Sequence, residues 1–219
     1  METGVSLDEA IQISLTEPLS RRTERVSIEE ARGRVTAVPL VSKVDDPGFD
    51  NSAMDGFAVR ESDCENEGAR LEIVGTSQAG GASPPEIGAG QACRIMTGAT
   101  LPAGADAIVM IEDTEIDGEH VVINGPARAG FIRRKAENLS IGQEALPSGT
   151  LLSSASIALA GTMGHGEIEV ITRPRIAILS TGDELIQPGQ ELSHGQIYES
   201  NSHALASLVE SMGCVAIRH

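Results

Sequence analysis

The stretch Asp45–Val59 reads DDPGFDNSAMDGFAV and marks the point where the pattern of the sequence changes. It combines four carboxylates with two of the three Phe residues of the chain. The pairs Pro47-Gly48 and Asp55-Gly56 are typical of turns. One hypothesis is an acidic loop that is held in place by its apolar side chains, Phe49, Met54 and Phe57. The other is a rigid loop that aims one carboxylate, Asp55, into a cleft.

Upstream of this stretch the sequence favours short helices and one extended segment. Residues 6–9 (SLDE) and 27–30 (SIEE) are capping boxes, in which a serine is followed three residues later by a glutamate. Each box predicts the start of a helix, and Gly33 is expected to end the second one. Residues 34–44 are rich in valine and alternate in polarity, so they predict an extended segment near an edge.

Downstream of the stretch, short β-type runs alternate with Gly, Pro and Asp turns up to about residue 150. The runs are ARLEIVG, QACRIMTG, DAIVMIED, EHVVING and GTLLS. This spacing predicts a small all-β domain.

The remaining sequence predicts a change to α/β structure. Residues 154–163 have helical spacing, and residues 167–171 predict a strand. The run 176–179 predicts a buried strand, residues 201–212 a helix capped by Asn201, and CVAIRH a second strand, which together make a β-α-β unit with parallel strands. Because one helix cannot cover both faces of a parallel pair, we expect this unit to lean on the remaining chain or a partner, or the sequence to be the front part of a longer protein. We favour the longer protein.

Composition excludes several classes of function. The 219 residues carry a formal net charge of −16, which argues against a nucleic-acid binder and against docking on an anionic membrane. The three cysteines form no C-x-x-C pair, and the first residues do not resemble a signal peptide. No apolar run is long enough to span a bilayer. These features predict a cytoplasmic protein.

Three further segments are candidates for chemistry. STGDEL (180–185) follows a predicted buried strand, where α/β sheets bind ligands, so its hydroxyls and the Gly182 amide could hold an oxyanion. FIRRKAEN (131–138) contains the densest basic run, which is either a solvated strand edge or an anion contact. Thr97-Gly98 follows a strand in RIMTGATLPAGADAIV and by itself indicates only a hairpin.

Taken in order, four segments resemble the signatures of the MoeA-type molybdopterin molybdenumtransferases, the family that includes the C-terminal region of gephyrin. They are PGFDNSAMDGFAV, RIMTGATLPAGADAIVMIED, FIRRKAEN and ILSTGDEL with GQIYESN. The resemblance implies a mixed α/β multidomain fold. Residues 1–44 and 151–173 would form a discontinuous helical and linker domain, residues 45–150 an inserted β domain, and residues 174–219 the beginning of an α/β parallel-sheet domain that binds molybdopterin.

The resemblance also implies a reaction and a site. Family members are homodimers that insert molybdate into adenylylated molybdopterin with release of AMP, assisted by a divalent cation, usually Mg²⁺. It implies catalytic and metal-binding roles for Asp55 and Glu184. It implies substrate contacts for Asn51, Ser52, Thr97, Gly98, Arg133, Asn138, Ser180, Thr181, Gly182 and Asp183.

The sequence departs from the family pattern at one place within the matched segments. The family usually reads Gly-Glu-Asp after the basic run, and this chain has Ala136-Glu137-Asn138. Asn138 keeps the shape of an aspartate but loses its charge, so we expect weaker metal binding. Besides the enzyme we therefore consider a non-catalytic binding or scaffold module of the same fold and, less favoured, an unrelated phosphate-binding α/β protein. The chain also stops before the family's Ser-Gly-Gly loop, so activity of these 219 residues alone is doubtful.

Overall fold

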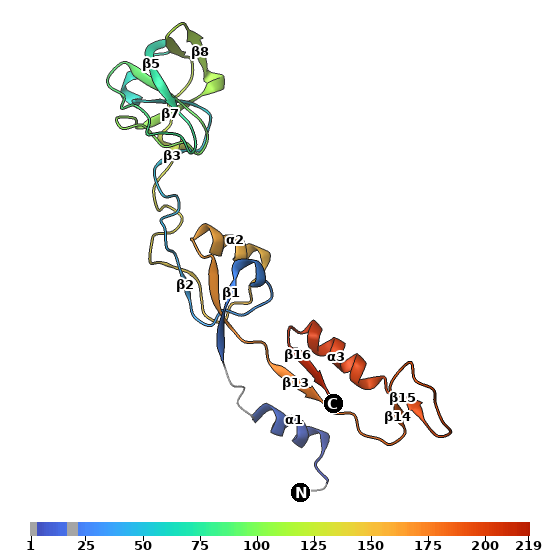
Figure 1. Ribbon diagram of the computed structural model, residues 1–219. Coiled ribbons are helices and arrows are strands. Elements are labelled where there is room, and N and C mark those ends of the chain that lie inside the picture. The colour runs from blue at the N-terminus through green and yellow to red at the C-terminus, as the bar shows by residue number, and fades with distance from the viewer. Residues whose placement is uncertain (1–3, 17–21) are drawn as a thin grey trace. The chain divides into compact units, whose positions relative to one another are not determined.

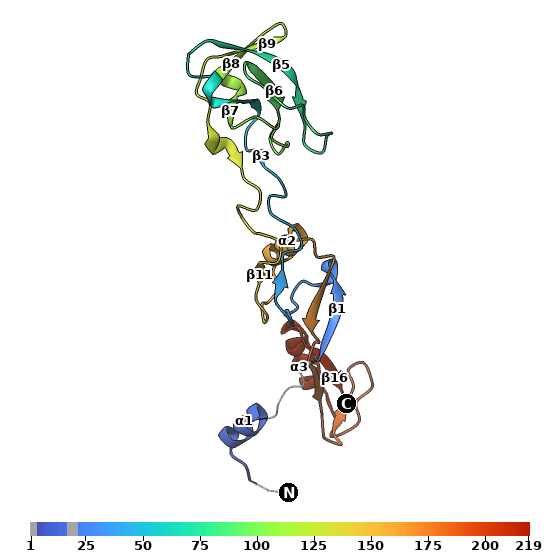
Figure 2. The same cartoon turned by 90° about the vertical axis from the view of Figure 1, so that its left-hand side faces the viewer.

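A computed structural model describes residues 4–16 and 22–219 (Figures 1 and 2). The chain forms two compact units. Unit 1 comprises Met1–Leu40, Leu146–Gly161 and His165–His219, and unit 2 comprises Val41–Ala145 and Thr162–Gly164. Each unit is therefore built from segments that are far apart in the sequence.

Unit 2 is built around a six-stranded mixed sheet with strand order β7-β4-β6-β5-β9-β8. The strands are β4 (Gly56–Val59), β5 (Ala69–Ser77), β6 (Gln91–Ile95), β7 (Ala107–Met110), β8 (Thr114–Asp117) and β9 (His120–Ile123). Only β5 and β6 pair in parallel. Two short 3-10 helices lie between strands of this sheet, η2 (Glu61–Asp63) after β4 and η3 (Ile111–Asp113) after β7, and a third, η4 (Ala129–Phe131), follows β9 and leads to β10. Figure 2 shows β5, β6 and β7 within this unit.

Two apolar clusters cover the two faces of β4 because successive side chains of a strand point in opposite directions. One cluster contains Phe57 and Val59, and the other contains Ala58 together with Ile95 of β6. All four residues of β4 are buried. The strand is thus a central structural element of unit 2.

The stretch that begins with Asp45 is only partly a loop. It contains β3 (Asn51–Ser52), which pairs with β10 (Ile132–Arg133), and it runs directly into β4. Phe57 is fully buried, whereas 47% of Phe49 is exposed. Phe57 is thus the aromatic side chain that the core holds, whereas a role of Phe49, about half of which is covered, in fastening the loop stays a prediction.

Unit 1 contains an antiparallel pair of β1 (Thr23–Ser27) with β12 (Glu167–Ile171). The helix α2 (Ser154–Thr162) and the 3-10 helix η1 (Ile28–Glu30) pack on this pair through a small apolar core. The core consists of Ala31, Leu40, Leu152, Ala160, Ile168 and Val170. β2 (Leu40–Val41) pairs with β11 (Glu144–Leu146).

The first capping box forms as predicted at the helix α1 (Leu7–Thr16). The backbone N–H of Glu9 donates to Oγ of Ser6, and the backbone N–H of Ser6 donates to Oε2 of Glu9. The second box yields only the 3-10 turn η1 instead of a longer helix. Its serine, Ser27, is still part of β1 and pairs with Glu167, so the strand continues up to the turn.

The predicted β-α-β unit is present in the last part of unit 1. β13 (Arg175–Ile178) pairs in parallel with β16 (Val215–Arg218), and α3 (Asn201–Ser211) connects them. A second parallel pair is formed by β14 (Leu185–Ile186) and β15 (Ile197–Tyr198). The N-cap of α3 is Ser200 rather than Asn201.

Two expectations about strands differ from the structure. The run GTLLS (149–153) forms no strand and contributes one isolated bridge, between Val35 and Leu151. Of residues 34–44, only Leu40 and Val41 belong to a strand, β2; Val35 and Thr36 form isolated bridges, and bends at 37–38 and 43–44 interrupt the extended run that the sequence predicts. In fold class the chain is nevertheless a mixture of sheets with few helices, as expected. Within the described ranges, no helix is both long and apolar enough to cross a bilayer.

Candidate functional site

The carboxylate of Asp55 is anchored by the turn that follows β6. The backbone N–H of Thr97 donates to Oδ1 of Asp55 at 2.7 Å, and the Thr97 hydroxyl donates to the same oxygen at 2.9 Å. These two bonds, the backbone bond first, lower the pKa of Asp55, and the positive charge of Arg94 lowers it further. Asp55 is exposed, so the structure holds an ionised carboxylate at the surface with Oδ2 available to a ligand.

The backbone around this pair is fixed by β3. The N–H of Gly98 donates to the carbonyl oxygen of Ser52, and the N–H of Ser52 donates to that of Ala99. Gly98 has a φ of 78°, a conformation that favours glycine. The turn that carries Thr97 is therefore locked to the strand that precedes Asp55.

The side chains of Asn51 and Ser52 serve the loop itself. Asn51 donates from Nδ2 to the carbonyl oxygen of Phe49 at 3.1 Å. The Ser52 hydroxyl donates to the carbonyl oxygen of Met54 at 2.5 Å and accepts from its N–H at 3.1 Å. Both residues are buried. This geometry gives them a role in shaping the turn, whereas contact with a substrate stays a prediction.

The basic run binds the acidic loop instead of lying free. Nη1 of Arg134 contacts Oδ2 of Asp50 at 2.7 Å, and Nζ of Lys135 contacts Oδ2 of Asp45 at 3.2 Å. The backbone N–H of Lys135 also donates to Oδ1 of Asp50. The pKa values of Asp45 and Asp50 are both lowered. In each case the larger cause is a hydrogen bond from a backbone N–H, and the second is the hydrogen bond from the cationic side chain. Sequence patterns indicated a solvated edge or an anion contact, and the anions turn out to be carboxylates of the same chain.

Two predicted site residues of this region lie at its surface. Arg133 is exposed and pairs through its backbone with Asn51. Asn138 is exposed and donates from Nδ2 to Oδ2 of Asp46 at 3.1 Å. Ala136, between them, has a φ of 61° and is the one non-glycine residue at positive φ in the described part of the chain.

The STGDEL segment lies in unit 1, directly after β13. Thr181, Gly182, Asp183 and Glu184 are exposed. Gly182 is at a φ of 151°, and a Cβ there would lie 2.7 Å from Oε2 of Glu184, so the glutamate side chain folds back over the glycine. The Ser180 hydroxyl donates to Oε1 of Glu199 at 3.1 Å.

Glu199 is a residue that the sequence patterns did not single out. It is 3% exposed, and it accepts bonds from the backbone N–H and the hydroxyl of Ser202, at 2.7 and 2.5 Å. These bonds lower its pKa. The carboxylate thus joins Ser180 to the first turn of α3, beside a hollow of about 390 Å³ that Ser180 and Thr181 help to line. The one feature of the sequence that could have identified Glu199 is its position shortly before the predicted helix that begins near Asn201.

The predicted site residues therefore fall into two sets. Asn51, Ser52, Asp55, Thr97, Gly98, Arg133 and Asn138 belong to unit 2, and Ser180, Thr181, Gly182, Asp183 and Glu184 belong to unit 1. Among the described residues, no group of three or more His, Cys, Asp or Glu is arranged to hold a metal ion. Mg²⁺ often binds through only one or two carboxylates together with waters and substrate oxygens, so an anchored, ionised Asp55 suits it as a ligand.

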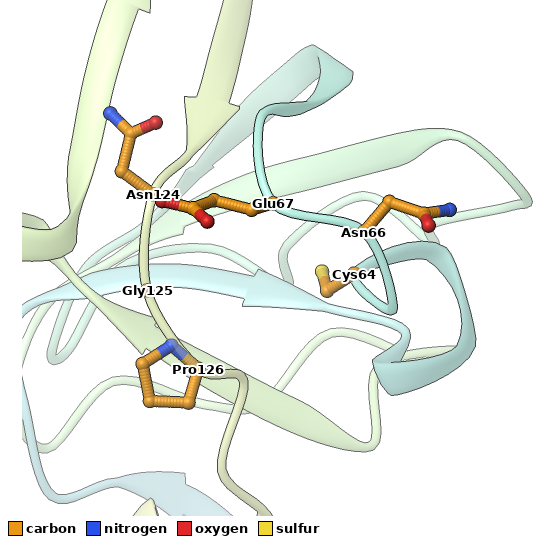
Figure 3. A pocket seen from close by; sticks show the side chains of 6 residues that line it. All are labelled: Cys64, Asn66, Glu67, Asn124, Gly125 and Pro126. Carbon is orange, nitrogen blue, oxygen red and sulfur yellow. The ribbon is translucent and has the colours of Figure 1, made fainter.

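A separate polar hollow of about 380 Å³ lies in unit 2 (Figure 3). It is lined by Cys64, Asn66, Glu67, Asn124, Gly125 and Pro126. Figure 3 shows the Glu67 side chain extending toward the 124–126 segment, while Asn66 points the other way. Burial, reinforced by neighbouring acids, raises the pKa of Cys64 to about 11, so its thiol stays protonated and is a poor nucleophile or metal ligand.

Known proteins resemble this chain over most of its length. The family description "MoeA N-terminal region (domain I and II)" matches residues 5–164. A molybdopterin molybdenumtransferase of Nostoc sp. is 42% identical over 89% of this chain and 46% of its own length. One from Haemophilus influenzae is 36% identical over 97% of this chain and 53% of its own length. The chain thus spans about half the length of these curated relatives.

A solved structure agrees with the sequence matches. The molybdopterin biosynthesis MoeA protein from Pyrococcus horikosii superposes with a TM-score of 0.85 at 34% identity, covering 98% of this chain and 56% of that protein. The match includes both the β-rich unit with the Asp55–Thr97 pair and the unit with the STGDEL segment. From its sequence and its fold alike, this chain belongs to the MoeA family of molybdopterin molybdenumtransferases.

Proposed function

We propose that this chain provides part of an enzyme of molybdenum cofactor biosynthesis, which inserts molybdate into adenylylated molybdopterin and releases AMP. The observation that carries the proposal is the Asp55 carboxylate, which Thr97 holds in place through two donors on one oxygen. Such an arrangement keeps the carboxylate ionised and oriented before a substrate arrives, which is what preorganised catalysis requires. Relatives named for this activity support the assignment.

The residues of the two units receive separate roles in this proposal. Asp55 and Glu184 are each candidates to hold Mg²⁺, which would neutralise the negative charge of phosphoryl and molybdate oxygens. Substrate contacts fall to Thr97, Gly98 and Arg133 in unit 2 and to the exposed STGDEL residues in unit 1. Asn51, Ser52, Asn138 and Ser180 act by fixing the local backbone or side chains that present those groups.

The assembly and domain roles are also carried over from the family resemblance. We propose a cytoplasmic homodimer in which residues 45–150 form an inserted β domain and residues 174–219 contribute to the molybdopterin-binding domain. Analytical ultracentrifugation tests the dimer, because a monomer has a mass of 22.8 kDa and a dimer twice that.

A chimera tests the enzymatic proposal. This chain replaces the matching half of the Haemophilus influenzae relative, and AMP release is measured with adenylylated molybdopterin, molybdate and Mg²⁺. We expect the chimera to release AMP and its Asp55→Asn variant to lose most of that activity. A folded chimera that releases no AMP, while the parent relative does so in the same assay, contradicts the proposal.

One observation favours a second candidate, a binding or scaffold module without turnover. Position 138 carries a neutral amide that is already bonded to Asp46. A chain of this kind would bind molybdopterin but release no AMP. Recovery of AMP release by Asn138→Asp in an inactive chimera would identify this position as the cause.

A further inference from the structure

Arg94 is the first residue of the segment RIMTGATLPAGADAIV, and the sequence analysis gave it no role of its own; the structure brings it close enough to Asp55 for its charge to act on that carboxylate. In the antiparallel pair of β4 and β6, Arg94 stands directly opposite Phe57. Asp55 precedes Phe57 by two residues and is the residue directly before β4, whose register with β6 begins at the pair Gly56–Ile95. Extended by one residue, this register places Asp55 opposite Met96 with Arg94 as its diagonal neighbour, and diagonal neighbours in a sheet are about 7–8 Å apart, within reach of a long side chain.

The guanidinium of Arg94 contains an unpaired buried donor. Among the described residues, its Nε is the one buried side-chain nitrogen or oxygen without a hydrogen-bond partner. Leaving a donor of a charged group buried and unpaired costs folding free energy, so such atoms call for an explanation. The residue as a whole is only partly buried, which leaves part of its side chain at the surface.

The surroundings suit an anion. Arg94 is in β6, the Thr97-Gly98 turn follows this strand, and Asp55, which Thr97 binds, directly precedes the neighbouring strand β4. Arg134 and Lys135 are already paired with Asp50 and Asp45, whereas Arg133, like Arg94, has no carboxylate partner among the ion pairs of the described residues. In a chain of net charge −16, a cation without a bonded carboxylate partner is a favourable place for an oxyanion.

We propose that Arg94 is an additional substrate-binding residue, whose guanidinium binds a tetrahedral oxyanion beside Asp55. This inference rests on the proposed function, because both substrates of that reaction offer a tetrahedral oxyanion. Adenylylated molybdopterin carries phosphoryl groups, and molybdate is itself a tetrahedral oxyanion. Arginine binds these anions through charge-assisted and forked hydrogen bonds.

Isothermal titration calorimetry of the 219-residue chain tests this with two probes, inorganic pyrophosphate and molybdate, titrated separately at low ionic strength. We expect Arg94→Met to weaken binding of at least one probe by about tenfold, and Arg94→Lys, which keeps the charge but not the fork, by about threefold. The probe that responds tells which group Arg94 binds. The matched control is Arg70→Met, which removes the same charge from an exposed pair with Asp117 and should leave binding unchanged.

Each result decides the proposal. The proposal is overturned if the wild type binds neither probe detectably. It is also overturned if a folded Arg94→Met variant binds the probes with an affinity within twofold of the wild-type affinity. Circular dichroism and thermal melting establish that the variants fold, and if Arg94→Met does not fold, wild-type affinity in Arg94→Lys overturns it. Oxyanion binding that depends on Arg94 without AMP release in the chimera would contradict the proposed function alone.

Discussion

The side-chain amide of Asn138 donates a hydrogen bond to Oδ2 of Asp46, with 3.1 Å between the nitrogen and the oxygen. The backbone N–H of Asn138 also donates to the carbonyl oxygen of Asp46, at 3.0 Å. The family resemblance of the segment FIRRKAEN implies an aspartate at position 138. In this chain a neutral amide therefore makes a bond that a carboxylate cannot make.

We predict that Asn138→Asp lowers the free energy of unfolding by about 1 kcal/mol at pH 7, because a hydrogen bond is replaced by two facing carboxylates. Added Mg²⁺ should recover part of the loss, since paired carboxylate oxygens are ligands that this cation accepts. Urea unfolding with EDTA and with millimolar Mg²⁺ measures both effects. The control is Asn66→Asp, an exposed position in the same unit. An equal loss in the control, or no response to Mg²⁺, contradicts the prediction.

Ala136, two residues earlier, adopts a left-handed backbone with a φ of 61°. This conformation costs about 1–2 kcal/mol for a residue with a Cβ and almost nothing for glycine, the residue that the family resemblance implies at this position. Because glycine also gains freedom in the unfolded chain, we predict that Ala136→Gly stabilises the protein by about 1 kcal/mol or less. Thermal and urea unfolding check this. Ala103→Gly, at an exposed position without a left-handed backbone, should be slightly destabilising, and stabilisation of both variants to the same extent would refute the explanation.

Local patterns predicted the elements whose signals are contained in a few neighbouring residues. The Ser6–Glu9 capping box starts α1, and the apolar runs at β13 and β16 form the expected parallel pair. The loop pattern also indicates the carboxylate of Asp55, whereas the local pattern around Thr97 indicates only a hairpin and its role is implied by the family resemblance. The bond between them joins residues 42 positions apart, and only the register of β4 against β6 brings them together.

Other features could not be predicted because they depend on distant partners. Phe49 and Phe57 are the same residue type in the same stretch, yet one is exposed and the other fully buried. Which of the two enters the core is decided by β4, whose place between β6 and β7 is set by pairing along the whole sheet. Likewise the ion pair between Arg134 and Asp50 joins residues 84 positions apart, so it depends on the fold of the whole segment between them.

The glycine of the Asp55-Gly56 pair illustrates such a distant constraint. A Cβ at Gly56 would lie 1.9 Å from the carbonyl oxygen of Val109 on β7. We predict that Gly56→Ala forces β4 away from β7 and destabilises unit 2 by about 3 kcal/mol or more. Gly130→Ala is the matched control, since no atom lies within 4 Å of its Cβ position and its φ is not in the left-handed region. Similar unfolding midpoints for both variants would show that the strands adjust without cost.

The hydroxyl of Thr97 is one of the two donors that lower the pKa of Asp55. Thr97→Val removes this donor but leaves the backbone N–H, so the pKa of Asp55 should rise part of the way toward its ordinary value. A lowered pKa keeps the carboxylate ionised down to a more acidic pH, so the variant should lose the ionised form at a higher pH than the wild type does. Carboxyl-detected NMR titration of the 219-residue chain measures the shift directly.

The same change should appear in catalysis by the chimera. If the ionised Asp55 is required, AMP release falls as the pH drops through the pKa of Asp55, and Thr97→Val moves this acidic limb to higher pH. Loss of a charge-assisted hydrogen bond also predicts a decrease of about tenfold at neutral pH. Thr97→Ser retains a hydroxyl and should keep both the limb and most of the rate. In the contrary outcome, the NMR titration of Thr97→Val shows a raised pKa of Asp55 while the acidic limb of AMP release stays at the wild-type pH. That result would mean that the ionisation of Asp55 does not limit the reaction.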